Sequence, residues 1–302
     1  MPVDPEPQPH KLLDFRARRR DIPAMRKRVQ IALAVALVML AGVTAWLGLR
    51  EREPVYQGRS LSKWLEDYTP LPGIFGLGDE RIILIRAGGE VQSYDNDFTK
   101  VDAAVRQIGA NALPTLFRML RAKDSALRLK LVRFAQKHPF IKMKYTTAET
   151  LNFRAVAGFR ALGGEAKNAV PELIEMYKHS PGSGRWGPGA ALGEIGPAAG
   201  EAIPSLLLNV GNTNAGAREI AVRALGQIHS QSQLVVPVLI AALHDPASQV
   251  QRQASPALGR YGEQAKAAVP ALLEILKHDR HPWISSALKA IDPEAAAKAG
   301  VR

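Results

Sequence analysis

The chain of 302 residues contains no cysteine. This absence excludes disulfides, thiolate catalysis and cysteine-ligated metal sites, and it leaves the redox state of the compartment undetermined. Histidines are few and scattered, seven in all. His278 and His281 supply two imidazoles beside a basic residue, whereas a metal site needs three or four converging ligands. We therefore expect no metal and no cofactor.

The sequence also lacks the common motifs of catalysis. No serine stands in a Gly-x-Ser-x-Gly elbow. The Gly88-Gly89 pair lacks the spacing and the following helix start that a phosphate-binding loop requires. Carboxylates such as Glu172, Glu175 and Glu274 fall on predicted helices, where they decorate an exposed face. We predict that the protein is not an enzyme.

One short phrase on a fixed period dominates the second half of the chain. The phrase is Ala-Leu-Gly, which occurs at 191–193, 224–226 and 257–259. Each copy is followed by a proline, and these prolines extend a series with a constant spacing of 33 residues: Pro171, Pro204, Pro237 and Pro270. A period between about 20 and 50 residues is typical of repeat architectures.

Each repeat predicts a pair of helices. Residues 216–228 place Ile220, Leu225 and Ile228 on one face at helical spacing, which predicts the first helix. We expect the second helix to start at Val236-Pro237, because proline is tolerated in the first turn. One such hairpin cannot bury its apolar face alone, so neighbours must stack. The sequence therefore predicts an all-α fold, an α-solenoid of about five helical hairpins.

The phrases Arg223-Ala224-Leu225-Gly226-Gln227-Ile228 and Ala267-Ala268-Val269-Pro270-Ala271-Leu272-Leu273 resemble HEAT repeats of the short bacterial type. This type is similar to the repeats of phycobilisome-lyase-like proteins, and the likeness covers roughly residues 101–292. The resemblance implies that the second helices line the concave surface. The residues one and four positions after each proline are then candidates for a binding groove: Thr115 and Arg118, Glu172 and Glu175, Ser205 and Leu208, Val238 and Ala241, and Ala271 and Glu274.

The N-terminus has the features of a membrane anchor. Residues 1–28 carry eight basic and four acidic side chains on a Pro-rich stretch, which we expect to be a disordered tail. Residues 29–49 contain no charge and are long enough to cross a bilayer as a helix. The basic excess before this span predicts a cytoplasmic N-terminus and repeats on the outer, periplasmic side. A cleaved signal with Val43-Thr44-Ala45 as its small-residue site is the alternative.

Residues 50–100 connect the anchor to the repeats. Leu61, Trp64, Leu65 and Tyr68 predict a short amphipathic helix after Ser60 as its N-cap. We expect this helix to cover the first hairpin, and a role in binding a partner or a membrane surface is the alternative. The stretch 69–100 is Gly- and Pro-rich. Within it, 81–85 and 90–94 predict either a small β-hairpin or an irregular insertion.

An insertion between the first and second repeats holds a dense basic segment. Residues 118–144 contain nine basic side chains and one acid, and we single out Arg118, Arg128, Lys130 and Arg133 as candidates for binding. Such a segment is either a solvated face or a site for an anionic partner: an acidic protein, a polyanion or lipid headgroups. Nucleic acid is an unexpected partner on the outer side of a membrane.

The third repeat departs from the pattern at its first helix. Its stretch 181–189 is rich in glycine and proline, so a regular helix is unexpected there. Trp186 lies in this stretch and either faces a ligand at a hinge or covers the core of a shortened helix. At the end of the chain, 283–292 predict a capping helix, and 293–302 a tail.

Together these features predict a membrane-anchored HEAT-repeat scaffold that binds another protein through its solenoid surface. The candidate binding residues include Glu172, Glu175 and Trp186. Two alternatives remain open. One is a chromophore-attachment or chaperone role, implied by the likeness to phycobilisome-lyase-like repeats. The other is docking to an anionic lipid or polymer through 118–144.

Overall fold

The computed structural model describes most of the chain from Glu53 onward. The described residues are 35, 37–39, 53–68, 82–85, 91–94, 98–126, 129–130, 132, 134, 145–180, 182–278 and 281–301. The chain divides into two units, Met1–Arg52 and Glu53–Arg302.

Only four residues of the first unit are described, Val35 and 37–39, and they are helical and exposed. The remainder of the predicted span 29–49 and the predicted tail 1–28 lie outside the described residues. A helix that is both long and apolar enough for a bilayer does not occur in the described part of the chain.

Over its described residues, the second unit is mostly helical and contains five helical hairpins. In each hairpin a first helix is followed by a second helix of 8 to 11 residues. The pairs are α3 (Thr99–Ile108) with α4 (Leu113–Leu120), α6 (Ala148–Leu162) with α7 (Val170–His179), α8 (Trp186–Ile195) with α9 (Ile203–Val210), α10 (Ala215–Ile228) with α11 (Ser232–Ala242), and α12 (Ser248–Arg260) with α13 (Val269–His278). The predicted solenoid of about five hairpins is therefore confirmed.

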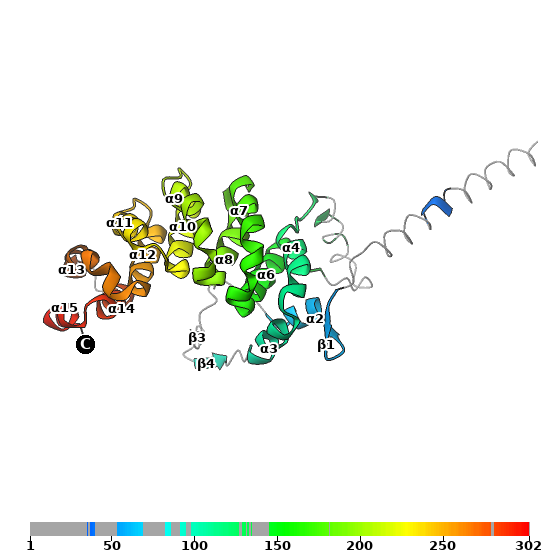
Figure 1. The fold of residues 1–302 in the computed structure, drawn as a ribbon, viewed down its shortest axis with the longest axis horizontal. Coiled ribbons are helices and arrows are strands. Elements are labelled where there is room, and N and C mark those ends of the chain that lie inside the picture. Colours follow the sequence, from blue (N-terminus) through cyan, green and yellow to red (C-terminus); the bar gives the residue numbers. More distant parts are fainter. Residues whose placement is uncertain are drawn as a thin grey trace, which may run out of the picture. The chain divides into compact units, whose positions relative to one another are not determined.

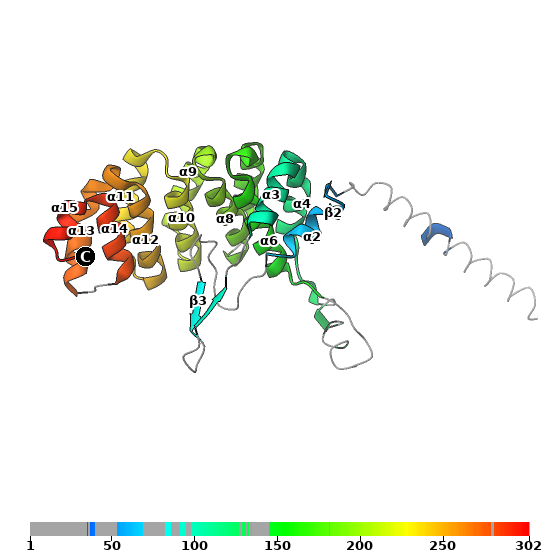
Figure 2. The same ribbon diagram turned by 90° about the horizontal axis from the view of Figure 1, so that it is seen from below.

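The hairpins stack through their first helices. Helices α6, α8, α10 and α12 contact one another in sequence order, and α14 (Pro282–Ile291) covers the last of them. Figures 1 and 2 show the hairpins side by side in one row, and in Figure 1 the second helices α7, α9, α11 and α13 lie along one side of it. The core is a continuous apolar cluster that runs through all the repeats. This arrangement explains the period. Each repeat packs against the repeat before it and the repeat after it, so the same contact positions recur in every repeat.

A residue with positive φ ends the first helix of each of the first four repeats: Gly109 (φ 59°), Gly163 (50°), Gly196 (73°) and His229 (46°). In the fifth repeat Gly262 (51°) occupies the equivalent place. A short 3₁₀ helix follows each glycine: Gly109–Ala112, Gly163–Ala169, Gly196–Ala202 and Gly262–Ala268. Only glycine adopts this backbone without strain.

The fourth repeat corrects one prediction. The sequence predicts Pro237 in the first turn of the second helix, but α11 begins at Ser232 and has Pro237 in its interior. His229 has ψ 50° where Gly163 has ψ −130° and Gly196 has −145°. This rotation redirects the chain, so the 3₁₀ segment is missing and the helix starts early. Elsewhere the prediction holds, since Pro171, Pro204 and Pro270 each occupy the second position of their helices.

The third repeat corrects a second prediction. The sequence predicts no regular helix over 186–189, yet α8 includes Gly187, Pro188 and Gly189. Pro188 lies in the first turn of this helix, where its missing N–H leaves no intrahelical bond unmade. The helix is nevertheless short, with 10 residues against 15 in α6 and 14 in α10.

The segment before the repeats covers their N-terminal end. Helix α2 (Leu61–Leu65) buries Leu61 and Leu65 completely and contacts α3 and α6. The predicted cap by Ser60 is absent. The Glu53 carboxylate takes its place and accepts hydrogen bonds from the Ser62 N–H and hydroxyl, both at 2.8 Å. Strands β1 (Val55–Tyr56) and β2 (Arg59–Ser60) pair antiparallel in a short hairpin, and this hairpin places Glu53 beside the start of α2.

A second hairpin lies in the insertion before α3. Strands β3 (Ile82–Ile85) and β4 (Val91–Tyr94) pair antiparallel, with Ile82 opposite Tyr94 and Ile85 opposite Val91. Of the two predicted alternatives for this region, the structure therefore has the hairpin. At the other end of the chain, the predicted tail contains one more helix, α15 (Pro293–Lys298), which Asp292 caps through the Ala295 N–H at 2.9 Å.

Candidate functional site

The second helices carry the candidate groove positions, and most of these are accessible. Six of the ten side chains are exposed: Arg118, Glu172, Glu175, Leu208, Ala241 and Glu274. Three more are half-buried: Ser205, Val238 and Ala271. Thr115 contradicts the prediction, because it is only 2% exposed. Arg118, which pairs with Glu53 of the N-terminal segment at 3.5 Å, also donates to the Thr115 hydroxyl, so Thr115 lies beneath that segment.

The acidic candidates of the second repeat are already paired within the protein. Glu172 forms an ion pair with Arg121. Lys178 lies 2.9 Å from the Glu175 carboxylate, and its hydrogen bond lowers the pKa of Glu175. Both pairs are solvent-exposed, so they contribute little to stability. A partner with charged groups can exchange with them at small cost.

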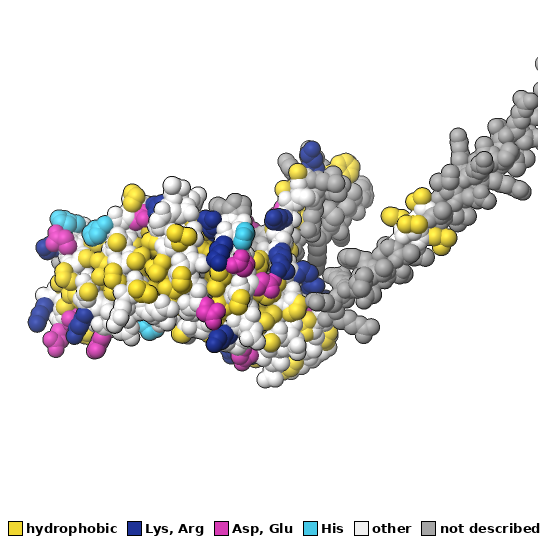
Figure 3. Space-filling model, turned by 45° about the horizontal axis from the view of Figure 1, so that its top comes forward, with side chains coloured by type: hydrophobic (Ala, Val, Ile, Leu, Met, Phe, Trp, Pro, Cys, Tyr) yellow, Lys and Arg dark blue, Asp and Glu magenta, His cyan; other side chains and the backbone are white. Residues whose placement is uncertain are grey.

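The next two second helices present an apolar surface without any charge. Helices α9 and α11 contain no Asp, Glu, Lys or Arg. Leu208 on α9 is 81% exposed and Leu234 on α11 is 58% exposed. Figure 3 shows a broad area of hydrophobic side chains over these helices, with charged side chains gathered on either side of it. We call α9 and α11 with these exposed leucines the apolar strip. Exposed apolar area with a charged rim is typical of a protein-binding surface.

The basic segment is only partly described. Lys130 is exposed, while Arg128 and Arg133 lie outside the described residues. Arg118 and Arg121, at the start of the segment, pair with Glu53 and Glu172. Part of the positive charge that the sequence shows is thus balanced within the protein. Of the apolar side chains described in this stretch, Val132 is buried and Phe134 is exposed.

Trp186 is half-buried at the start of α8 and packs against the core. It also lines a pocket of about 620 Å³ between α6, α8 and α10. The pocket exists because α8 begins about one turn later than its neighbours. We call it the α8 pocket. Its lining comes from the first helices and the turns before them: Glu149, Asn152, Gly184, Trp186, Asn214, Gly216, Glu219, Ile220 and Arg223.

Two ionisable side chains near the α8 pocket have shifted pKa values. Burial raises the pKa of the Glu194 carboxyl, and a hydrogen bond from Gln227 at 2.8 Å opposes this shift. Burial lowers the pKa of the Arg223 guanidinium, and the charges of Glu194 and Glu219 oppose it. No sequence motif marks either residue as functional. The positions of Glu194 and Gln227 follow the period of the repeats, because the two residues are 33 positions apart and their side chains are hydrogen-bonded across successive repeats.

Groups of three or more metal-ligating side chains are absent from the described residues. His179 and His278 each lie within 4 Å of a glutamate on the preceding helical turn, at 3.6 and 3.8 Å. Such pairs are ordinary contacts at the C-terminal ends of α7 and α13.

The repeats match a known family. The family model described as HEAT repeats matches residues 203–292, which include α9 to α14. The chain therefore contains HEAT repeats over residues 203–292. A search of curated proteins found none that matches the chain.

Proposed function

We propose that the protein is a non-catalytic scaffold, anchored in a membrane by residues 29–49, that binds another protein through its second helices. HEAT repeats generally mediate protein–protein interaction, which supports a protein partner. The observation that carries the proposal is the apolar strip, where an 81% exposed leucine lies among uncharged side chains. A stacked array holds such a strip rigid, so several repeats can contact one extended partner.

Site-specific crosslinking in cells tests this binding surface. A photoreactive amino acid replaces Leu208 on α9 of the full-length protein, and the matched control carries it at Arg252, which is exposed on the first helix α12. We expect a covalent adduct of defined mass from position 208 and none from position 252. Equal adducts at both positions, or none at either, contradict binding through the strip.

The anchor and the orientation form a separate part of the proposal. The 21-residue uncharged span and the basic residues before it support a cytoplasmic N-terminus and an outer, periplasmic location of the repeats. A reporter that is active only outside the cytoplasm, fused after Arg302, should be active. A full-length protein that stays in the aqueous fraction without detergent contradicts the anchor.

A second candidate is docking to an anionic lipid or polymer through the basic segment. It is favoured by Lys123 and Lys130, which are exposed and form no ion pair with any described residue. Replacement of Arg128, Lys130 and Arg133 by Gln should weaken sedimentation with vesicles that contain anionic lipid. Neutral vesicles are the control, and unchanged sedimentation excludes this candidate.

A further inference from the structure

The α8 pocket lies on the first helices and not on the apolar strip, so a ligand there is independent of the proposed function. Helix α8 is about one turn shorter at its N-terminus than α6 and α10, and the 3₁₀ turn Gly182–Arg185 stands in place of that turn. Gly187 lets the start of α8 pack closely against the Asn152 side chain of α6, which lines the pocket. A Cβ at Gly187 would come within 2.6 Å of the Asn152 side-chain oxygen. The volume of about 620 Å³ lies in the range of sites that hold small organic ligands.

Arg223 is a side chain of this pocket whose hydrogen-bond donors are unused. It lies half-buried on α10, and its guanidinium forms no hydrogen bond or ion pair with the described residues. Glu194 and Glu219 act on it through their charge without forming a pair. A guanidinium has five N–H donors, and those of the half-buried Arg223 have no protein partner among the described residues. A carboxylate is the group that matches this planar donor set in two parallel hydrogen bonds.

The rest of the lining narrows the choice of ligand. Glu149 and Glu219 place negative charge in the same pocket, which disfavours a multiply charged anion such as a phosphate. They accept hydrogen bonds and thus favour a ligand that carries N–H donors near its carboxylate. Trp186 and Ile220 supply apolar surface for a side chain. A single carboxylate, an adjacent amide N–H and a side chain occur together in the last residue of a peptide.

We propose that the α8 pocket binds the C-terminal residue of a peptide chain. The terminal carboxylate pairs with Arg223, the amide N–H faces Glu149 or Glu219, and the side chain packs against Trp186 and Ile220. Capture of a terminal carboxylate is an established mode of peptide recognition by proteins.

The test uses full-length protein and twenty N-acetylated tripeptides that differ only in their last residue. Each peptide is compared by calorimetry with its C-terminal amide. We expect at least one free acid to bind with Kd below about 1 mM, and its amide to bind roughly ten- to a hundredfold more weakly, as loss of a charged hydrogen bond predicts. Equal binding of acid and amide overturns the proposal, as does the failure of all twenty acids.

Variants assign the effect to Arg223. Arg223→Gln should weaken binding of the free-acid peptide by the same factor as amidation does. It should leave the affinity for the amidated peptide unchanged. Arg252→Gln, at an exposed position of α12, is the matched control and should change neither. If Arg223→Gln lowers Tm, Arg223→Lys preserves the charge and should lose only part of the preference for the acid. Full affinity in a folded Arg223 variant overturns the assignment.

Discussion

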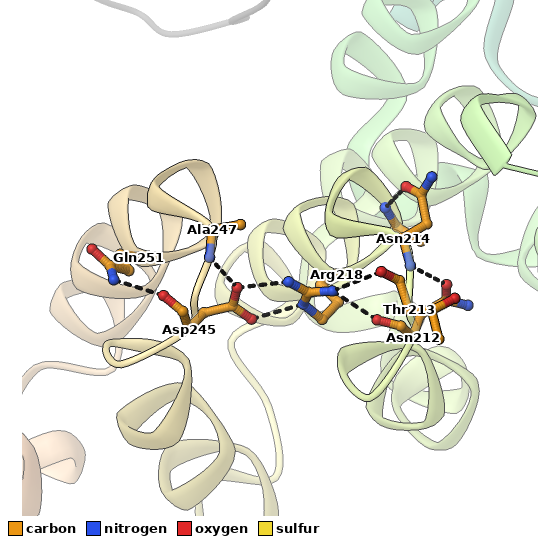
Figure 4. A network of polar contacts seen from close by, with 8 residues as sticks. Asn212, Thr213, Asn214, Arg218, Asp245, Ala247 and Gln251 are labelled. Carbon is orange, nitrogen blue, oxygen red and sulfur yellow. Dashed lines mark hydrogen bonds and ion pairs between the residues drawn. The ribbon is translucent and has the colours of Figure 1, made fainter.

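Arg218 holds Asp245 in a two-bonded ion pair that joins successive repeats. The Arg218 Nε lies 2.7 Å from Asp245 Oδ2, and its Nη2 lies 2.8 Å from Oδ1. The same guanidinium donates to the Asn212 carbonyl at 2.8 Å, and Asp245 accepts from the Ala247 N–H, also at 2.8 Å (Figure 4). Both side chains are nearly buried, at 13% and 10% exposed. The pair therefore fixes the turn before α10 to the turn before α12.

Arg218→Lys should destabilise the protein although it keeps the charge, because lysine cannot form two parallel bonds. We expect a loss of about 1.5–3 kcal/mol in the free energy of unfolding, the usual contribution of a hydrogen bond to a charged group. Urea unfolding followed by circular dichroism measures this loss. The control Arg252→Lys changes an exposed arginine and should stay within about 0.5 kcal/mol. Equal stability of the two variants would show that the pair is unimportant.

The same pair predicts a dependence of stability on pH. The hydrogen bond from Arg218 lowers the pKa of Asp245 below its ordinary value, although burial opposes the shift. A depressed pKa means that the ionised carboxylate stabilises the folded state above the unfolded pKa of about 3.9 and that this contribution is lost as pH falls further. In Asp245→Asn the carboxylate is missing at every pH. The stability difference between wild type and this variant should therefore be largest near neutral pH and shrink below about pH 4. A difference that is constant down to acid pH contradicts the assignment.

The period of 33 residues predicts the architecture because it records the geometry of stacking. Each repeat places equivalent side chains on its neighbour, so the spacing of Pro171, Pro204 and Pro270 indicates the starts of three second helices. The prediction is wrong at Pro237 because the backbone between α10 and α11 is left-handed at both His229 and Gln231, unlike the turns that begin with glycine in the other repeats. A pattern of residue types does not reveal ψ at a single position.

The candidate site is less predictable because its contacts do not follow the period. Arg118 meets Glu53 from 65 residues away, and Arg121 meets Glu172 across the insertion. Neither separation is a multiple of the repeat. The α8 pocket results from a missing helical turn, which the Gly- and Pro-rich sequence does indicate. The presence of Arg223 in the pocket lining is not predictable from the sequence, because an arginine on an amphipathic helix is usually solvated.

Gly196→Ala should destabilise the third repeat. Gly196 has φ 73° and ψ −145°, a conformation that a residue with a Cβ adopts only under strain. We expect a loss of about 1–3 kcal/mol, which is the usual cost of such strain. The control is Gly200→Ala in the following 3₁₀ helix, where φ is not positive and the nearest atom to a new Cβ, the Ser230 hydroxyl oxygen, is 3.7 Å away. Thermal unfolding should separate the two variants, and a Tm for Gly196→Ala at or above that of Gly200→Ala would refute the assignment.

Two leucines on α9 test which side of that helix faces solvent, and thus the existence of the apolar strip. Leu206 is fully buried, whereas Leu208 is 81% exposed. Leu206→Ala should cost about 2–5 kcal/mol, because it removes buried apolar surface and leaves a cavity. Leu208→Ala should change stability by less than about 0.5 kcal/mol, since its side chain already contacts water. Urea unfolding of both variants measures the contrast. A large cost at Leu208 would mean that this side chain is packed in the free protein, and the strip would then not be available to a partner.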